Sequence, residues 1–117
     1  MSFDLKSVVL EILDNMKAIN VQSLDVRPLT TIADHMVFAT GTSNRHVQAL
    51  SQSLVVKLKG TSRPPLGVEG TKEGEWVLID LGDIIVHIMQ AETRAFYQVE
   101  KLWQSESAHR MAVGTIG

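Results

Sequence analysis

The segment WVLIDLGDIIVHIM, residues 76–89, constrains the fold more than any other part of the sequence. Two apolar runs flank Gly82, and the connection between them is too short for anything but an antiparallel hairpin. Because side chains alternate between the two faces of a strand, the face that carries Val77 is wholly apolar and is expected to face the core. The opposite face carries Trp76 and His87, which should lie near each other across the strands. An aromatic ring beside polar groups is typical of a surface that binds another protein.

Periodicity along the rest of the chain predicts further helices and strands. The spacing of apolar side chains predicts helices over residues 4–18, 44–59 and 91–103. Apolar and β-branched runs predict strands over residues 21–26 and 35–40, and a short edge strand within PLGVEG at 65–70. The last helix is expected to bury Phe96, Val99, Leu102 and Trp103.

The order of these elements predicts an α/β domain with a mixed sheet, built as a two-layer or three-layer sandwich. The strand at 35–40, the helix at 44–59 and the strand that follows this helix should form a β-α-β unit. The two strands of such a unit are parallel, and the crossover between them is right-handed.

Composition excludes several classes of protein. The chain has 117 residues, one domain by default, and 11 Lys and Arg against 13 Asp and Glu give a net charge of −2. A net-negative domain argues against DNA binding driven by phosphate neutralisation. The absence of cysteine excludes disulfides and thiolate metal sites. With neither a signal-peptide pattern nor an apolar stretch long enough to span a membrane, a soluble cytoplasmic protein is expected.

The first candidate for a catalytic or metal site combines Asp80, Asp83 and His87. Side chains four residues apart along a strand are separated by about 13 Å, which is too far for a single ion. The favoured alternative is that both aspartates accept backbone N–H bonds around the Leu81–Gly82 turn. The four histidines lack the spacing of metal ligands, so no metal site and no cofactor are expected.

The second candidate is GTSNRH at 41–46, where a strand ends and a helix begins. Free N–H groups at such a helix start can bind an anion, with Thr42, Ser43, Arg45 and His46 around it. Nucleotidyltransferases use a Gly-Ser turn at this place, but they also need an Asp-x-Asp pair to hold two metal ions. No such pair follows the turn, so helix capping by Thr42 or Ser43 is favoured. A nucleotidyltransferase-like enzyme or a binder of phosphorylated ligands is the alternative.

Three segments resemble the ribosomal silencing factor family, also called RsfS or Iojap. They are TGTSNRHV at 40–47, GVEG at 67–70 and WVLIDLGDIIVHIMQAETRAFYQVEKLW at 76–103. The resemblance implies a nucleotidyltransferase-like fold that lacks the catalytic carboxylates, and a protein that is not an enzyme. It covers nearly all of a domain placed at residues 1–103, and leaves a tail at 104–117 that is expected to be poorly ordered.

The resemblance also implies a partner and a mechanism. Family members bind the large ribosomal subunit through ribosomal protein L-fourteen and sterically block joining of the small subunit, which lowers translation when nutrients are scarce. Free members are often homodimers. The contact would involve Trp76 and Leu81, although Leu81 must then project outward from the hairpin tip. The residues predicted to bind this partner are Trp76, Leu81, Asp80, Asp83, His87 and Glu69, whose acidic members would complement a basic ribosomal protein.

Overall fold

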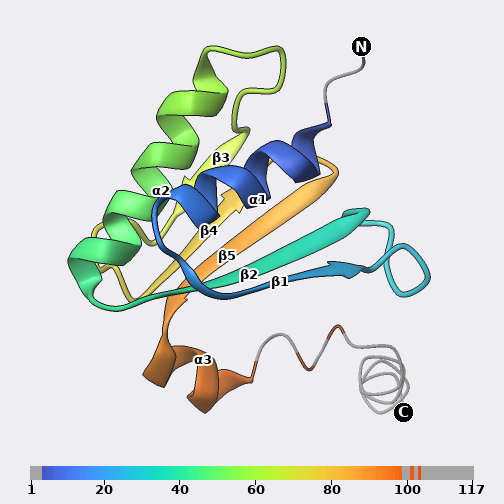
Figure 1. The fold of residues 1–117 in the computed structure, drawn as a ribbon. Coiled ribbons are helices and arrows are strands. Elements are labelled where there is room, and N and C mark those ends of the chain that lie inside the picture. The colour runs from blue at the N-terminus through green and yellow to red at the C-terminus, as the bar shows by residue number, and fades with distance from the viewer. Residues whose placement is uncertain (1–3, 99–100, 102, 104–117) are drawn as a thin grey trace.

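The computed structural model describes residues 4–98, 101 and 103, which form an α/β domain (Figure 1). Its helices are α1 (Leu5–Asn15), α2 (Asn44–Lys59) and α3 (Ala91–Tyr97). Its strands are β1 (Ile19–Asp25), β2 (His35–Gly41), β3 (Gly67–Glu69), β4 (Trp76–Asp80) and β5 (Ile84–Gln90). The tail at 104–117 and its predicted lack of order lie outside the described residues. None of the helices in the described part of the chain has the length and apolar character that crossing a bilayer requires.

The five strands form one mixed sheet in the order β1-β2-β5-β4-β3. The predicted hairpin is present, with β4 and β5 antiparallel, and the short strand β3 lies at the sheet edge, as the prolines before it suggested. The predicted β-α-β unit is wrong in one respect, because β2 runs parallel to β5 and not to the strand that follows α2. The physical reason is length. All seven residues of β5 pair with β2, whereas β3 has only three residues, and these pair with β4.

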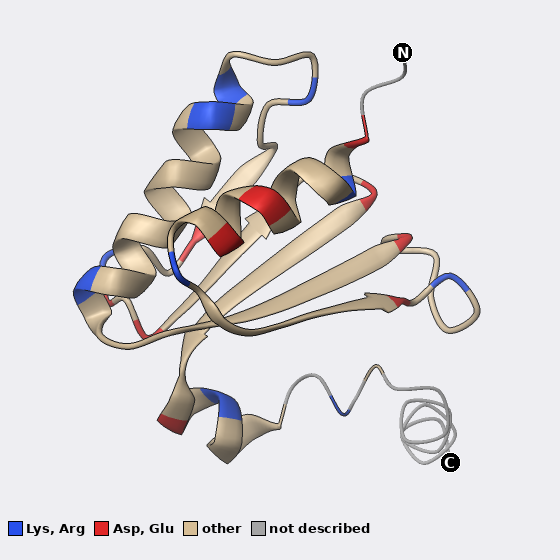
Figure 2. Cartoon of the chain, in the orientation of Figure 1, with Lys and Arg blue, Asp and Glu red and all other residues tan. Residues whose placement is uncertain are grey.

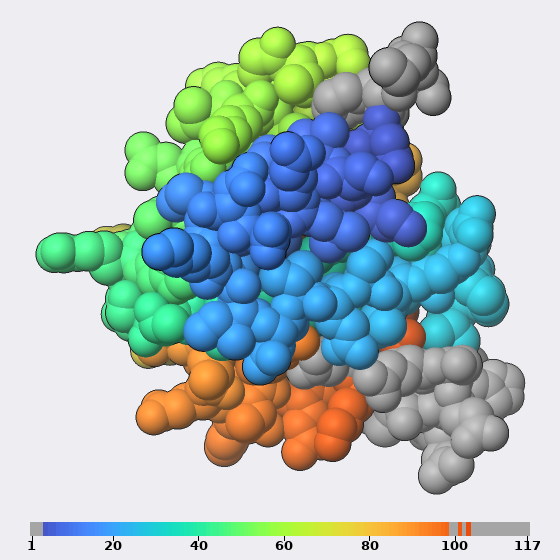
Figure 3. Space-filling model, viewed as in Figure 1, coloured from blue at the N-terminus to red at the C-terminus, as the bar shows by residue number. Residues whose placement is uncertain are grey.

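Helices α1 and α2 cover one face of the sheet (Figure 1). The alternation of the hairpin places four fully buried side chains on this face, namely Val77, Ile79, Val86 and Ile88. In the space-filling view, the side chains of α1 lie between α2 and β1 and hide the middle of the sheet (Figure 3). The prediction that this hairpin face is core is therefore confirmed.

The opposite face of the sheet, called the open face below, is only partly covered. Helix α3 lies on this side and contacts β2 and β5, so the sandwich has two layers with a partial third (Figure 1). A second, smaller apolar cluster forms here from Val26, Met36, Phe38 and Met89. Among the residues that the structure describes, α3 is the only helix on this side of the sheet.

Helix α3 is shorter than predicted and buries a different residue. It ends at Tyr97, because Gln98 adopts a left-handed conformation with φ 49°. Phe96, which was expected to be buried, is 80% exposed, and Arg94 is the residue that packs against the sheet. Trp103 is half-buried against the second cluster, in line with its predicted burial. The predicted burial of Val99 and Leu102 lies outside the described residues.

Candidate docking surface

The strand register places several of the predicted site residues on the open face. Directly opposite residues in an antiparallel pair point to the same side of the sheet. Trp76 pairs with Met89, Leu78 with His87, and Asp80 with Ile85, while Glu69 of β3 pairs with Leu78. Glu69 is exposed, and Trp76, Leu78, Asp80 and Ile85 are half-buried. These five residues are called the open-face patch: Glu69, Trp76, Leu78, Asp80 and Ile85.

The ring of Trp76 is held in place by His87. Its indole Nε1 donates a hydrogen bond of 3.1 Å to Nδ1 of His87. The imidazole also stacks on Phe38, with ring centroids 4.9 Å apart and planes within 9°. His87 is only 5% exposed, and burial lowers its pKa from 6.5 to about 4. The imidazole is therefore neutral at physiological pH, which leaves Nδ1 free to accept the indole N–H.

Tyr97 at the end of α3 also contacts Trp76. The two ring centroids are 5.3 Å apart, and Phe96 meets Tyr97 edge-on at 4.9 Å. Tyr97 is 55% exposed. Trp76 thus contacts both a buried imidazole and an exposed phenol, and it belongs to an aromatic surface.

Leu81 is not part of this surface. The sequence analysis expected Leu81 to project outward at the hairpin tip, but the side chain is only 3% exposed and belongs to the main core cluster. The expectation fails because Leu81 N–H donates to the carbonyl of Ile84, which continues the hairpin ladder through this position. Strict alternation therefore extends to the tip and directs Leu81 toward the helices.

The two hairpin aspartates have different roles. Asp80 accepts a hydrogen bond of 2.9 Å from the N–H of Gly82, which confirms its predicted role in the turn. Gly82 has φ 93°, a conformation that favours glycine. Asp83 was expected to do the same, but its carboxylate instead forms an ion pair with Arg63 in the loop after α2. Among the described residues, no group of three His, Cys, Asp or Glu side chains could hold a metal ion.

The turn at residues 41–46 uses its polar groups internally. The Ser43 hydroxyl accepts the N–H of His46 at 3.0 Å, which confirms the predicted N-cap of α2. Nε2 of His46 lies 2.9 Å from the carbonyl of Met16, which can only accept, so this nitrogen carries the proton. Nδ1 then accepts the Thr42 N–H at 2.9 Å. The N–H group that an anion would need at Thr42 is thus already bonded, while Arg45 is exposed.

Sequence reasoning missed three contributions to this region. Leu78 and Ile85 were not among the predicted site residues, although the alternation of the hairpin puts both on the same face as Trp76. Tyr97 could be assigned to the exposed side of its helix, but its contact with Trp76 depends on how α3 packs. No local pattern indicates that Arg63 would pair with Asp83, because the two residues are brought together only by folding.

Together these features define a small α/β domain whose most prominent site is an aromatic and apolar surface patch with acidic residues beside it. A family model described as ribosomal silencing factor during starvation matches residues 2–116. The match therefore also spans the tail that the resemblance to this family had left out. The chain belongs to the family of ribosomal silencing factors, which are ribosome-associated regulators of translation.

Individual relatives agree with this assignment. The ribosomal silencing factor of Chromobacterium violaceum is 41% identical over 100 residues, which cover 86% of this chain and 82% of that protein. A crystal structure of a protein from the same organism has a TM-score of 0.82 at 39% identity, and the match covers 86% of this chain and 87% of that one. A more distant mouse relative, named mitochondrial assembly of ribosomal large subunit protein 1, is 34% identical over 90% of this chain and 47% of its own length.

Proposed function

We propose that this protein binds the large ribosomal subunit in the cytoplasm through ribosomal protein L-fourteen and sterically blocks joining of the small subunit. Translation would fall as a result when nutrients are limiting. Membership of the ribosomal silencing factor family supports the ribosomal target. The name of the mouse relative, which refers to the large subunit, supports the choice of subunit. The single observation that carries the docking site is the open-face patch, in which His87 holds the ring of Trp76 in place.

In this proposal Trp76 is the anchor of the contact. Its ring is half-buried and is oriented by His87 below and by Tyr97 beside it, so little side-chain freedom is lost when a partner binds. Leu78 and Ile85 extend the apolar area of this face along the hairpin. Large aromatic side chains with apolar neighbours are the residues that dominate the binding energy of protein interfaces.

The acidic residues of the region would attract a basic partner. Glu69 and Asp80 belong to the patch, and Asp83 lies at the hairpin tip with its side chain 43% exposed. Figure 2 shows Lys and Arg toward the two ends of α2 and in the loop after it, whose Arg63 pairs with Asp83. Opposite charges across an interface mainly raise the association rate. His87 and Leu81 would act indirectly, His87 by orienting Trp76 and Leu81 by supporting the hairpin from the core.

Replacement of Trp76 by alanine tests the anchor. Loss of a buried interface tryptophan typically costs about 2 kcal/mol or more, so Trp76→Ala should weaken binding to purified large subunits at least roughly 30-fold. Co-sedimentation with separated subunits measures the affinity, and circular dichroism confirms that the variant is folded. If a folded Trp76→Ala protein pelleted with large subunits to the same extent as the wild type, the assignment of Trp76 as the anchor would be wrong.

A charge-reversal pair tests the surface without disturbing the core. Glu69 is exposed on the open face, whereas Glu11 is exposed on α1 on the other side of the sheet. Glu69→Lys should slow association with large subunits at low salt, and Glu11→Lys, which changes the net charge equally, should not. Equal effects of the two variants would show that total charge matters and the patch does not.

Sedimentation equilibrium of the same variants shows whether the predicted homodimer also uses this surface.

A further inference from the structure

Leu66 is a large apolar side chain that the protein leaves 71% exposed. It ends the loop between α2 and β3, which covers residues 60–66. A single exposed leucine is ordinary, because a folded protein cannot cover its whole surface with polar groups. Leu66 is unusual because the chain around it is fastened to its neighbours at several points, so that the exposed side chain projects from a well-held backbone.

The loop before Leu66 is tied both to itself and to the β4–β5 hairpin. The Thr61 hydroxyl accepts the N–H of Arg63 at 3.1 Å. The guanidinium of Arg63 then forms an ion pair with the carboxylate of Asp83 at the hairpin tip. Pro64 and Pro65 follow, and the ring of each proline fixes one backbone dihedral angle. The loop therefore has little conformational freedom left to lose when a partner binds.

Leu66 itself lies against the end of the open-face patch. Its N–H donates a hydrogen bond of 2.8 Å to the carbonyl of Asp80, which is a member of the patch. The carboxylate of Asp80 also accepts the N–H of Gly82 at 2.9 Å. A Cβ atom at Gly82 would lie 3.6 Å from Cδ1 of Leu66. The leucine side chain is thus placed beside the hairpin tip, where the patch ends.

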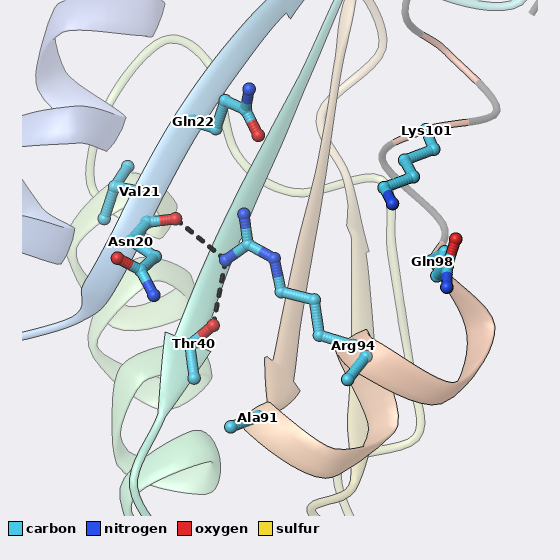
Figure 4. A pocket seen from close by; sticks show the side chains of 9 residues that line it. Asn20, Val21, Gln22, Thr40, Ala91, Arg94, Gln98 and Lys101 are labelled. Carbon is cyan, nitrogen blue, oxygen red and sulfur yellow. Dashed lines mark hydrogen bonds between the residues drawn. The ribbon is translucent and has the colours of Figure 1, made fainter. Parts of the chain in front are cut away.

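The opposite end of the patch is held in a similar way. Tyr97 of α3 contacts Trp76, with ring centroids 5.3 Å apart. The same helix is fastened to the first two strands by Arg94, whose Nη1 donates bonds of 2.8 Å to the carbonyl of Asn20 and to the hydroxyl of Thr40 (Figure 4). Both the aromatic end and the tip end of the docking surface are therefore set before any partner arrives.

A single partner is large enough to contact both ends. Trp76 and Asp80 are four residues apart on β4, which corresponds to about 13 Å along a strand. A standard interface buries about 800 Å² of each protein, an area about 30 Å across. Leu66, which is bonded to Asp80, therefore falls within the area that a partner seated on Trp76 would cover.

We infer that Leu66 is a second apolar anchor of the docking surface and inserts into an apolar depression on the same ribosomal protein that Trp76 contacts. This inference rests on the proposed function and extends its site to the loop after α2. Arg63 and Asp83 neutralise each other beside the leucine, so the contact at the tip is apolar. The contact at Glu69, in contrast, is ionic, because this exposed carboxylate faces a basic partner.

Replacement of Leu66 by alanine tests the second anchor. Leu66→Ala should weaken binding to purified large subunits about tenfold in co-sedimentation, because it removes apolar surface that the interface buries. Val56→Ala is the matched control. Val56 is 62% exposed on α2, which covers the other face of the sheet, so its replacement should leave the affinity unchanged (Figure 1).

Salt dependence separates the apolar contact from the ionic one. Salt screens charges but not apolar contacts, so the loss caused by Leu66→Ala should be the same at about 0.05 M and about 0.3 M KCl. The loss caused by Glu69→Lys should shrink over this range. A loss at Leu66 that disappears with added salt would overturn the assignment of an apolar contact.

The Trp76→Ala variant distinguishes failure of this inference from failure of the proposed function. If Trp76→Ala weakens binding while Leu66→Ala binds as well as Val56→Ala, the second anchor is wrong and the proposed docking surface stands. If Trp76→Ala and Leu66→Ala both bind large subunits at full strength, the docking surface lies elsewhere and both proposals are overturned.

Discussion

The burial of a neutral histidine makes the stability of this fold depend on pH. His87 is 5% exposed, and burial lowers its pKa from 6.5 to about 4. Between these two values the unfolded chain binds a proton that the folded chain does not, so acid favours unfolding. The free energy of unfolding should therefore be level above pH 6.5 and fall as the pH drops toward 4. A difference of about 2.5 pKa units at about 1.36 kcal/mol each corresponds to a loss of about 3 kcal/mol.

Urea unfolding at a series of pH values, for the wild type and for His87→Gln, measures this contribution. Glutamine does not titrate, and its side-chain oxygen can still accept the N–H of Trp76. Carboxylates that titrate in the same range contribute to both proteins and cancel in the difference. The wild type should lose about 3 kcal/mol relative to the variant between pH 7 and pH 4, which is a large part of a typical domain stability of about 5–15 kcal/mol.

NMR titration of the imidazole of His87 provides a direct second measurement of its pKa. Unfolding curves of the wild type and His87→Gln that run parallel from pH 7 to pH 4 would refute the reasoning.

Two further predictions concern the hairpin tip and the start of α2. Leu81→Ala should lower the free energy of unfolding by about 2–5 kcal/mol, because it leaves a cavity in the core, while Leu66→Ala, at a side chain 71% exposed, should change it by less than about 0.5 kcal/mol. Equal stabilities of these two variants in urea unfolding would show that the tip side chain is not part of the core. Ser43→Ala should cost about 1 kcal/mol through loss of the cap on His46 N–H, and Ser43→Asp, which can still accept this bond, should cost less. Thermal unfolding compares the pair, and equal losses would contradict the capping role.

Much of the fold follows from local sequence patterns. The apolar alternation of residues 76–89 indicated both faces of the hairpin, and the buried positions of β4 and β5 agree with it. Helix α2 has the predicted boundaries, because Ser43 can cap its start and Gly60 follows its end. These features were predictable since they depend on side chains that are neighbours in the sequence or lie one turn apart.

The candidate site was predictable only in part. Alternation placed Trp76 beside His87, and their hydrogen bond confirms the pair. Alternation continued to the hairpin tip directs Leu81 into the core, where the structure has it, whereas the resemblance required an outward side chain. The role of these residues in binding a partner stays a prediction.

By itself, the sequence determined the identity of the elements, the two faces of the hairpin and the membership in the ribosomal silencing factor family. Only the tertiary structure decided that β2 pairs with β5, that Asp83 binds Arg63, and that α3 packs through Arg94 and leaves Phe96 exposed. The physical reason is the range of the interactions. Periodicity and capping act over a few residues, whereas strand pairing and the burial of a charged side chain depend on groups that meet only when distant segments pack together.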